Sequence, residues 1–167
     1  MTPDGATESQ TYDKCSTLLV FRLGEELIAL DVRSVREIVD PLPMAAVPGA
    51  PSSAPGLVNV RGSIVTVLDL RARLGLRAGT RTRDSRLVVT ETAINDDAVT
   101  VAFEADAVVQ VLEIPSDRIE PVPEIGVSWP SGLLGGIFRH DDALVTLLDA
   151  VAALAPTAPG RGANPCS

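Results

Sequence analysis

One order of segments occurs twice in this chain of 167 residues, and that repeat most constrains its fold. In each half a strand, a turn and a second strand precede an apolar segment, prolines and glycine. Each half then reaches a similar run, IVTVLD at residues 64–69 and LVTLLD at residues 144–149. Such β-branched runs favour strands. The repeat predicts two similar β lobes. Because lobes of about 65 residues bury little surface alone, they should pack together and leave a groove at their junction.

The first half contains a predicted hairpin, after which the spacing between apolar residues changes. Residues 18–23 and 27–30 are apolar runs on either side of a turn, which predicts two paired strands. Residues 32–39 place apolar side chains three or four positions apart. This spacing predicts a short amphipathic helix or helical turn, with Asp31 as its N-cap and Pro41 as its end.

The second half follows the same order. Its predicted segments are strands at 86–91 and 99–103, an apolar segment at 107–112 that corresponds to residues 33–38, and a short alanine-rich helix at 150–154. The first half has a matching helical turn at 71–75, which ends on glycine.

Polar ends frame the predicted domain. Residues 1–16 and 156–167 are expected to be disordered tails. Residues 17–155 then form the folded part, with lobes at about 17–75 and 86–150 that are intertwined at their edges.

Charge and composition exclude several classes of partner. The net charge of −8 argues against nucleic acid, because phosphate binding needs a basic surface. Aromatic residues make up only 3% of the chain, too few for a base-stacking platform. The apolar runs are far shorter than the roughly 20 residues that cross a bilayer, so membrane insertion is not expected. The N-terminus lacks the apolar segment of a signal peptide, so the cytoplasm is the expected location.

Catalytic and metal chemistry have few candidate residues. His140 is the only histidine and lies in a predicted polar turn, so a histidine-based metal site or Ser-His-acid triad is not expected. The cysteines, Cys15 and Cys166, lie near opposite ends and are interpreted as incidental thiols. Asp69 and Asp149 could be an acid pair, but we favour N-caps of the helical turns that follow them. We expect no cofactor.

Two motifs carry a resemblance to a known family. Residues 56–62, GLVNVRG, followed by 67–71, VLDLR, resemble the signature GVxNLRG and PVVDLR of CheW-type chemotaxis coupling proteins. Further segments that fit in the same order lie at 21–26, 32–38, 119–123 and 144–154. The sequence departs from the family pattern at four positions, where Thr66 replaces proline, Leu27 tyrosine, Val60 leucine and Ala102 glycine.

The resemblance implies an all-β fold of two five-stranded SH3-like barrels packed side by side, with short helical turns and a short C-terminal helix. It also implies a non-enzymatic adaptor. Such an adaptor bridges the regulatory domain of a CheA-type histidine kinase and the cytoplasmic tip of methyl-accepting chemoreceptors, and is recruited to membrane-associated receptor arrays.

Other uses of the same fold stay open. The chain could couple a non-flagellar chemosensory pathway that controls gliding, pili or development. It could also be an isolated copy of the kinase's own regulatory domain, which would still act as a scaffold. A receiver domain is missing, which argues against a CheV-type coupling protein.

The resemblance implies two sets of functional residues, and the chemistry of individual residues adds a structural set. The receptor-binding groove would contain Val32, Val35, Glu37, Ile38, Asn59 and Arg61. Kinase contacts would include Leu42, Met44, Val47, Phe103, Val108 and Val111. A structural set comprises Gly56, Gly62, Asp69 and Asp149. The alternative for the valines and Ile38 is core packing, and for Arg61 an internal salt bridge with Glu37 as candidate partner.

Overall fold

A computed structural model describes residues 15–52, 54–77, 79–123 and 131–155. Its strands are β1 (Cys15–Leu23), β2 (Glu26–Asp31), β3 (Val35–Val39), β4 (Ala45–Ala46), β5 (Gly56–Val60), β6 (Ser63–Leu68), β7 (Arg86–Ile94), β8 (Asp97–Ala105), β9 (Ala107–Pro115), β10 (Leu134–His140) and β11 (Ala143–Leu148). The helices are α2 (Leu70–Leu74) and α3 (Ala150–Leu154), and short 3-10 turns are η1 (Val32–Ser34), η2 (Ser116–Arg118) and η3 (Ser131–Leu133). The predicted all-β fold with two short helices is confirmed.

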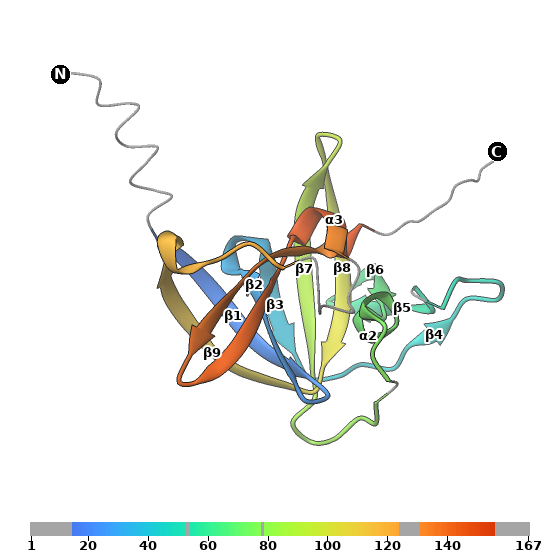
Figure 1. The fold of residues 1–167 in the computed structure, drawn as a ribbon. Coiled ribbons are helices and arrows are strands. Elements are labelled where there is room, and N and C mark those ends of the chain that lie inside the picture. The colour runs from blue at the N-terminus through green and yellow to red at the C-terminus, as the bar shows by residue number, and fades with distance from the viewer. Residues whose placement is uncertain (1–14, 53, 78, 124–130, 156–167) are drawn as a thin grey trace.

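The strands form two sheets that lie side by side (Figure 1). One has the order β10-β11-β2-β1-β9 and is called the β9 lobe, after its edge strand. The other has the order β3-β7-β8-β6-β5-β4 and is called the β3 lobe. Its sixth strand is the two-residue β4.

The lobes are not the two halves of the sequence, so the predicted division into 17–75 and 86–150 is wrong. The hairpin β1–β2 pairs with β9 and β11 from the second half. The hairpin β7–β8 pairs with β3 and β6 from the first half. Each repeat thus gives its first hairpin to the other lobe. The parallel contacts β11–β2 and β6–β8 are equivalent in the two lobes.

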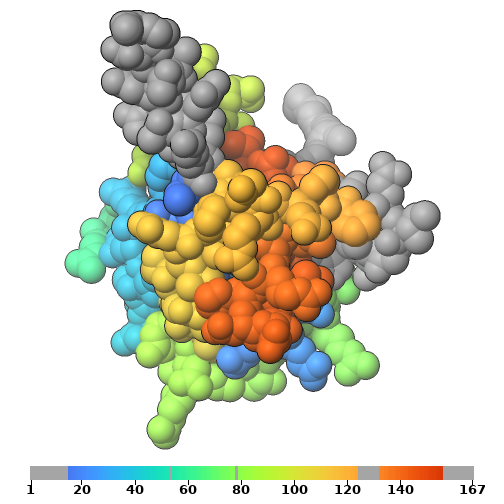
Figure 2. Space-filling model, turned by 60° about the vertical axis from the view of Figure 1, so that its left-hand side comes forward, coloured from blue at the N-terminus to red at the C-terminus, as the bar shows by residue number. Residues whose placement is uncertain are grey.

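Each sheet is closed by the chain that follows its edge strand. In the β3 lobe, β4 follows β3 and pairs with β5. In the β9 lobe, Glu120 follows β9 and exchanges two backbone hydrogen bonds of 2.8 Å with Ile137 on β10. Figure 2 shows β9 and the β10–β11 hairpin beside each other on one face. The closing chain passes so close that a Cβ on Gly56 would lie 2.5 Å from the Ala45 carbonyl oxygen, and one on Gly136 2.9 Å from that of Glu120.

Three apolar clusters make up the core. One cluster fills the β3 lobe and another fills the β9 lobe. The third draws on both sheets and both helices, and its largest members are Phe21 and Phe103, whose ring centroids are 5.0 Å apart. The main core therefore lies between the lobes, as expected for two units too small to fold alone.

The predicted helix at residues 32–39 is wrong. Asp31 does cap a turn, since its Oδ1 accepts a hydrogen bond from the Arg33 N–H at 2.8 Å. That turn is only the three-residue η1, and the chain continues as β3. β3 contains a β-bulge between Val35 and Glu37, but its burial still alternates, so Glu37 faces inward and Ile38 outward. Because an acidic residue takes an inward position and an apolar residue an outward one, the spacing of apolar residues resembles that of a helix.

The predicted tail boundary also needs correction. Cys15 and Ser16 were assigned to the N-terminal tail, but they begin β1 and pair with the end of β9. The rest of that tail, residues 1–14, and the predicted tail at 156–167 with its Cys166 lie outside the described residues. Within the described ranges, none of the helices has the length and apolar character needed to span a bilayer.

Candidate functional site

The β5–β6 turn presents the most distinctive side chain of the repeat. Arg61 and Gly62 occupy the turn with φ of 53° and 90°, which fits a two-residue hairpin turn with both central residues at positive φ. The Asn59 side chain accepts a hydrogen bond from the Gly62 N–H at 2.8 Å and so fixes the turn. Arg61 therefore lies at a turn, and its side chain is 76% exposed.

Arg61 meets Glu37 across the opening of the rolled sheet. Its Nε donates to Glu37 Oε1 at 2.8 Å, while the Glu37 side chain is only 25% exposed. Because β3 and β5 are far apart in the strand order, this ion pair closes the β3 lobe and joins no residue of the other lobe. Among the described residues, the remaining N–H groups of Arg61 have no hydrogen-bond partner. They can reach a carbonyl or carboxylate of another molecule.

The structure brings together only part of the predicted receptor groove. Glu37, Asn59 and Arg61 lie at one end of the β3 lobe. Val32 and Val35 are half-buried and pack against the central core. Ile38 is exposed and follows Glu37 in β3, so it points to the opposite face.

Sequence reasoning missed Ile64 as a surface residue. Its side chain is 65% exposed and it lies directly across from Asn59 in the β5–β6 ladder. Leu144 holds the equivalent position of the second repeat, across from Arg139, and is 55% exposed. The signal was present, because Val65 and Val67 point into the barrel and alternation then directs Ile64 outward.

The predicted kinase contacts have different outcomes. Phe103 is fully buried against Phe21 in the central core, so its prediction as a contact is wrong. Val108 is partly buried and packs against the same core. The exposed members of the set are Met44, Val47 and Val111.

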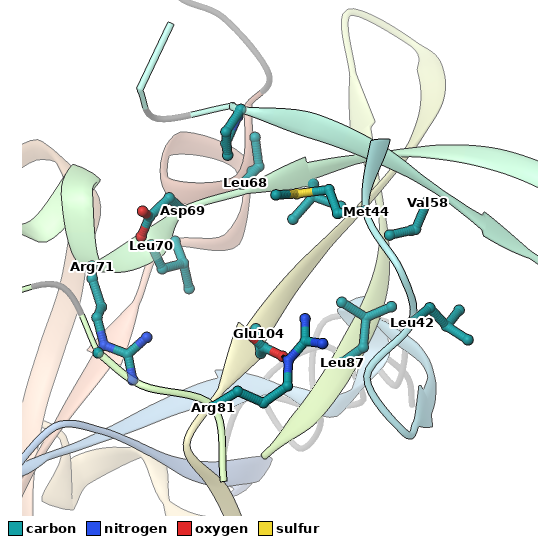
Figure 3. Close-up of a pocket in the computed structure, with 13 residues that line it drawn as sticks. Leu42, Met44, Val58, Leu68, Asp69, Leu70, Arg71, Arg81, Leu87 and Glu104 are labelled. Atoms are coloured by element: carbon teal, nitrogen blue, oxygen red, sulfur yellow. Dashed lines mark hydrogen bonds and ion pairs between the residues drawn. The ribbon is translucent and has the colours of Figure 1, made fainter. Parts of the chain in front are cut away.

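A pocket of about 180 Å³ opens at the end of the β3 lobe. Its apolar wall includes Leu42, Met44, Val58, Val67 and Leu87. Figure 3 shows charged side chains on the other side, where Arg71 and Arg81 approach the hollow. The Arg81 Nε donates to Glu104 Oε2 at 2.6 Å.

A second hollow lies on the β9 lobe, and the described residues that line it include none from the strands of the β3 lobe. It is a shallow space of about 430 Å³ between η1, the end of β11 and the start of α3. Asp31 and Arg33 line it on one side and Asp149 and Val151 on the other. The side-chain hydrogen bond from Arg33 holds the pKa of Asp31 below its ordinary value.

The two aspartates at matching positions of the repeat cap the helices that follow them. Asp69 Oδ1 accepts from the Ala72 N–H at 3.1 Å, and Asp149 Oδ1 accepts from the Ala152 N–H at 3.3 Å. Both side chains are N-caps, of α2 and α3 respectively. The described residues contain no group of three His, Cys, Asp or Glu side chains that could hold a metal ion.

Asp106 is a structural junction that the sequence did not reveal. Its carboxylate accepts from the Gly24 N–H at 2.5 Å and forms an ion pair with Arg71 of α2. It thereby ties the β1–β2 turn to the helix that follows β6, across the two lobes. Partial burial opposes ionisation of Asp106, but the hydrogen bonds from Arg71 and Gly24 outweigh it and lower the pKa.

The comparisons with known proteins agree with one another. The model of the family described as CheW-like domain matches residues 17–156. A probable chemotaxis protein CheW of Rhizobium etli is 29% identical over 140 residues, which cover 84% of this chain and 88% of that protein. The chemotaxis protein CheW of Helicobacter pylori is 32% identical over 128 residues, 77% of this chain and 74% of that one. The crystal structure of the scaffolding protein TtCheW from Thermoanaerobacter tengcongensis matches with a TM-score of 0.72 and 30% identity, covering 80% of this chain and 84% of that chain.

Proposed function

The chain belongs to the CheW-like domain family, and on that premise we propose that it is the adaptor that couples methyl-accepting chemoreceptors to a CheA-type histidine kinase. The observation that carries the proposal is the family match over residues 17–156 together with the exposed Asn59–Gly62 turn that the family motif encodes. The adaptor acts without catalysis, in the cytoplasm, where the receptor tips lie.

The receptor surface is proposed at the end of the β3 lobe that carries the Glu37–Arg61 pair. A helical hairpin needs apolar contacts with a few polar anchors at their rim. Arg61 and Asn59 supply the anchors, and Ile38 supplies exposed apolar area on the adjacent outer face of β3, opposite to the side chain of Glu37. Val32 and Val35 contribute their accessible edges, since both are only partly buried.

Kinase contacts are proposed at the barrel ends. On the β3 lobe they comprise Leu42, Met44 and Val47, and we add Ile64 because its side chain is exposed. On the β9 lobe they comprise Val111 and the accessible part of Val108, with Leu144 added by its equivalence to Ile64. Two similar ends on one adaptor allow it to contact two neighbours, which suits a lattice of weak contacts.

Calorimetry with the regulatory domain of the CheA-type kinase from the same organism tests the proposal. We expect one-to-one binding in the micromolar range, about −8 kcal/mol. The control variant is Glu25→Ala, which changes an exposed residue of the β1–β2 turn, outside the proposed contacts, and should bind like wild type. The proposed role with this kinase is refuted if the wild-type protein shows no binding up to about a hundred micromolar, which corresponds to a binding free energy of about −5.5 kcal/mol.

A further inference from the structure

The basic residues of this acidic chain are concentrated in one segment. Residues 71–86, which we call the arginine segment, contain six arginines and one acidic residue, Asp84. The segment therefore carries a net charge of +5 in a chain of −8, which leaves −13 on all other residues. Separation of charge on this scale creates a local positive field on an otherwise negative surface.

The protein's own acids engage only part of this segment. Arg71 pairs with Asp106 and Arg81 with Glu104. The Nη1 of Arg73 donates to the Ala153 carbonyl at 2.8 Å. Arg77 and Arg83 are exposed, and their side chains have no ion pair with any described residue. These two guanidinium groups are therefore available to another molecule.

The arginine segment also forms one wall of the pocket at the end of the β3 lobe. Within the segment, Gly79 lies so close to Arg71 that a Cβ on Gly79 would be 2.5 Å from the guanidinium carbon of Arg71. Figure 3 shows Arg71 and Arg81 on one side of the hollow and Met44 and Leu42 on the other. Asp69 and Glu104 line the hollow as well, and Arg71 and Arg81 are both ion-paired. The unpaired positive charge beside the pocket is therefore that of Arg77 and Arg83, each two residues along the chain from the lining residues Gly79 and Arg81.

We infer that this pocket and the arginine segment bind an acidic segment of a partner protein, in which an apolar side chain lies between carboxylates. The planar guanidinium group matches carboxylate in a bidentate geometry. The pocket of about 180 Å³ is smaller than the roughly 300–1,000 Å³ of small-molecule sites, so it suits a single side chain.

The charge of the rest of the molecule selects a short partner segment. An extended polyanion, such as nucleic acid or an anionic bilayer, would also face the −13 of the remaining residues and be repelled. A short acidic segment can lie along Arg77 and Arg83 without meeting most of that negative charge. Because Leu42 and Met44 are also proposed kinase contacts, the inference rests on the proposed function for the identity of the partner and adds the chemistry of its docking segment.

Fluorescence anisotropy with a labelled peptide tests the inference. The probe is a leucine flanked by glutamates, and a second peptide has serine in place of the leucine. We expect Arg77→Glu with Arg83→Glu to weaken binding of the leucine probe at least about tenfold, and Met44→Ser or the serine peptide to weaken it by a smaller factor. The control protein, Arg36→Glu with Arg139→Glu, undergoes the same change of net charge at other exposed sites and should bind like wild type.

Several results would overturn the inference. They are failure of the leucine probe to bind wild type, equal loss with both double variants, and equal binding of a peptide with lysines in place of the glutamates. Arginine-dependent binding to phosphatidylglycerol vesicles without binding to the peptide would assign the segment to a membrane surface instead. If the kinase domain binds wild type and the two double variants equally, the inference is contradicted and the proposed function is left intact. A kinase domain that binds none refutes the proposed function, and the peptide titration then decides the inference alone.

Discussion

Arg61 donates from Nε to Glu37 Oε1 at 2.8 Å and so connects the β5–β6 turn to the opposite edge of the same rolled sheet. The pair is asymmetric, because Glu37 is largely covered while Arg61 is mostly exposed. Glu37 is therefore part of the barrel wall, whereas Arg61 is part of the surface. The two alternatives for Arg61, an internal salt bridge and a partner contact, are therefore compatible.

Replacing Arg61 separates these two roles. Arg61→Ala should lower the free energy of unfolding by less than about 1 kcal/mol, because exposed ion pairs contribute little. The same variant should weaken binding to receptor or kinase. Urea unfolding and calorimetry on one preparation measure both quantities. A loss of several kcal/mol in stability with unchanged partner binding would make Arg61 a purely structural residue.

The glycines that allow barrel closure should not tolerate a side chain. Gly136→Ala places a Cβ 2.6 Å from Ile119 Cγ2 and 2.9 Å from the Glu120 carbonyl, and Gly56→Ala creates the corresponding clash with β4. Each should destabilise the protein by about 1–3 kcal/mol, the usual cost of overpacking. Gly132→Ala is the control, since a Cβ there meets nothing within 4 Å. Thermal unfolding of the three variants provides the comparison, and equal stability of Gly136→Ala and Gly132→Ala would contradict this account of closure.

The Asp106 junction should make stability depend on pH. Its pKa is lower in the folded protein than the ordinary value of 3.8. The unfolded chain therefore binds the proton more readily, so the stabilisation is complete above about pH 5 and is lost as pH falls through the folded pKa. Asp106→Asn should cost about 1.5–3 kcal/mol at pH 7, as for hydrogen bonds to charged groups. Urea unfolding at pH 7 and pH 3 should show that the difference in the free energy of unfolding between wild type and Asp106→Asn shrinks at the lower pH. A difference that is the same at both pH values would refute the role of the Asp106 carboxylate.

Exposed apolar residues at the two equivalent barrel ends should act in binding more than in folding. Ile64→Ser and Leu144→Ser should each change stability by no more than about 0.5 kcal/mol, as is usual for surface sites, and should weaken binding of the kinase regulatory domain. Val151→Ser, at an equally exposed position on α3, is the matched control. Calorimetry in which all three variants bind alike would exclude the barrel ends as the kinase surface.

Exchange of hairpins between the repeats predicts that neither half of the chain folds alone. The hairpin β1–β2 would lack β9 and β11, and β7–β8 would lack β3 and β6. Circular dichroism of the separate fragments 1–84 and 85–167 should show no cooperative unfolding, whereas the intact chain should unfold in one transition. A fragment with a cooperative transition of its own would contradict the exchange.

The repeat predicted the hairpins β1–β2 and β7–β8, the strands β6 and β11 and the caps Asp69 and Asp149, because these depend on neighbouring residues. The turns at 61–62, 95–96 and 141–142 all have positive φ at both positions, and Gly, Asn and Asp, which tolerate that backbone, occupy every one of these positions except that of Arg61. Strand partners depend on distant residues. The alternation of β1 and β2 identifies their buried faces but contains no information on which of two similar sets of strands they join.

Which apolar side chains pack between the two lobes could not be predicted for the same reason. Phe103 and Ile64 both lie in apolar strands, yet one is at the centre of the core and the other is on the surface. The difference arises because Phe103 faces the second lobe and Ile64 lies next to an open turn. The bulge at residues 35–37 likewise depends on the pairing of β3 with β7, which local spacing does not specify.

The central claim is that this chain joins a receptor to a kinase, and co-sedimentation tests it most directly. Receptor-bearing membranes and the CheA-type kinase from the same organism are centrifuged with and without the purified protein. The account predicts that the kinase enters the pellet in a saturable manner only when the protein is present, and less so with Arg61→Ala or Ile64→Ser. Kinase sedimentation that is equal with and without the protein would contradict it.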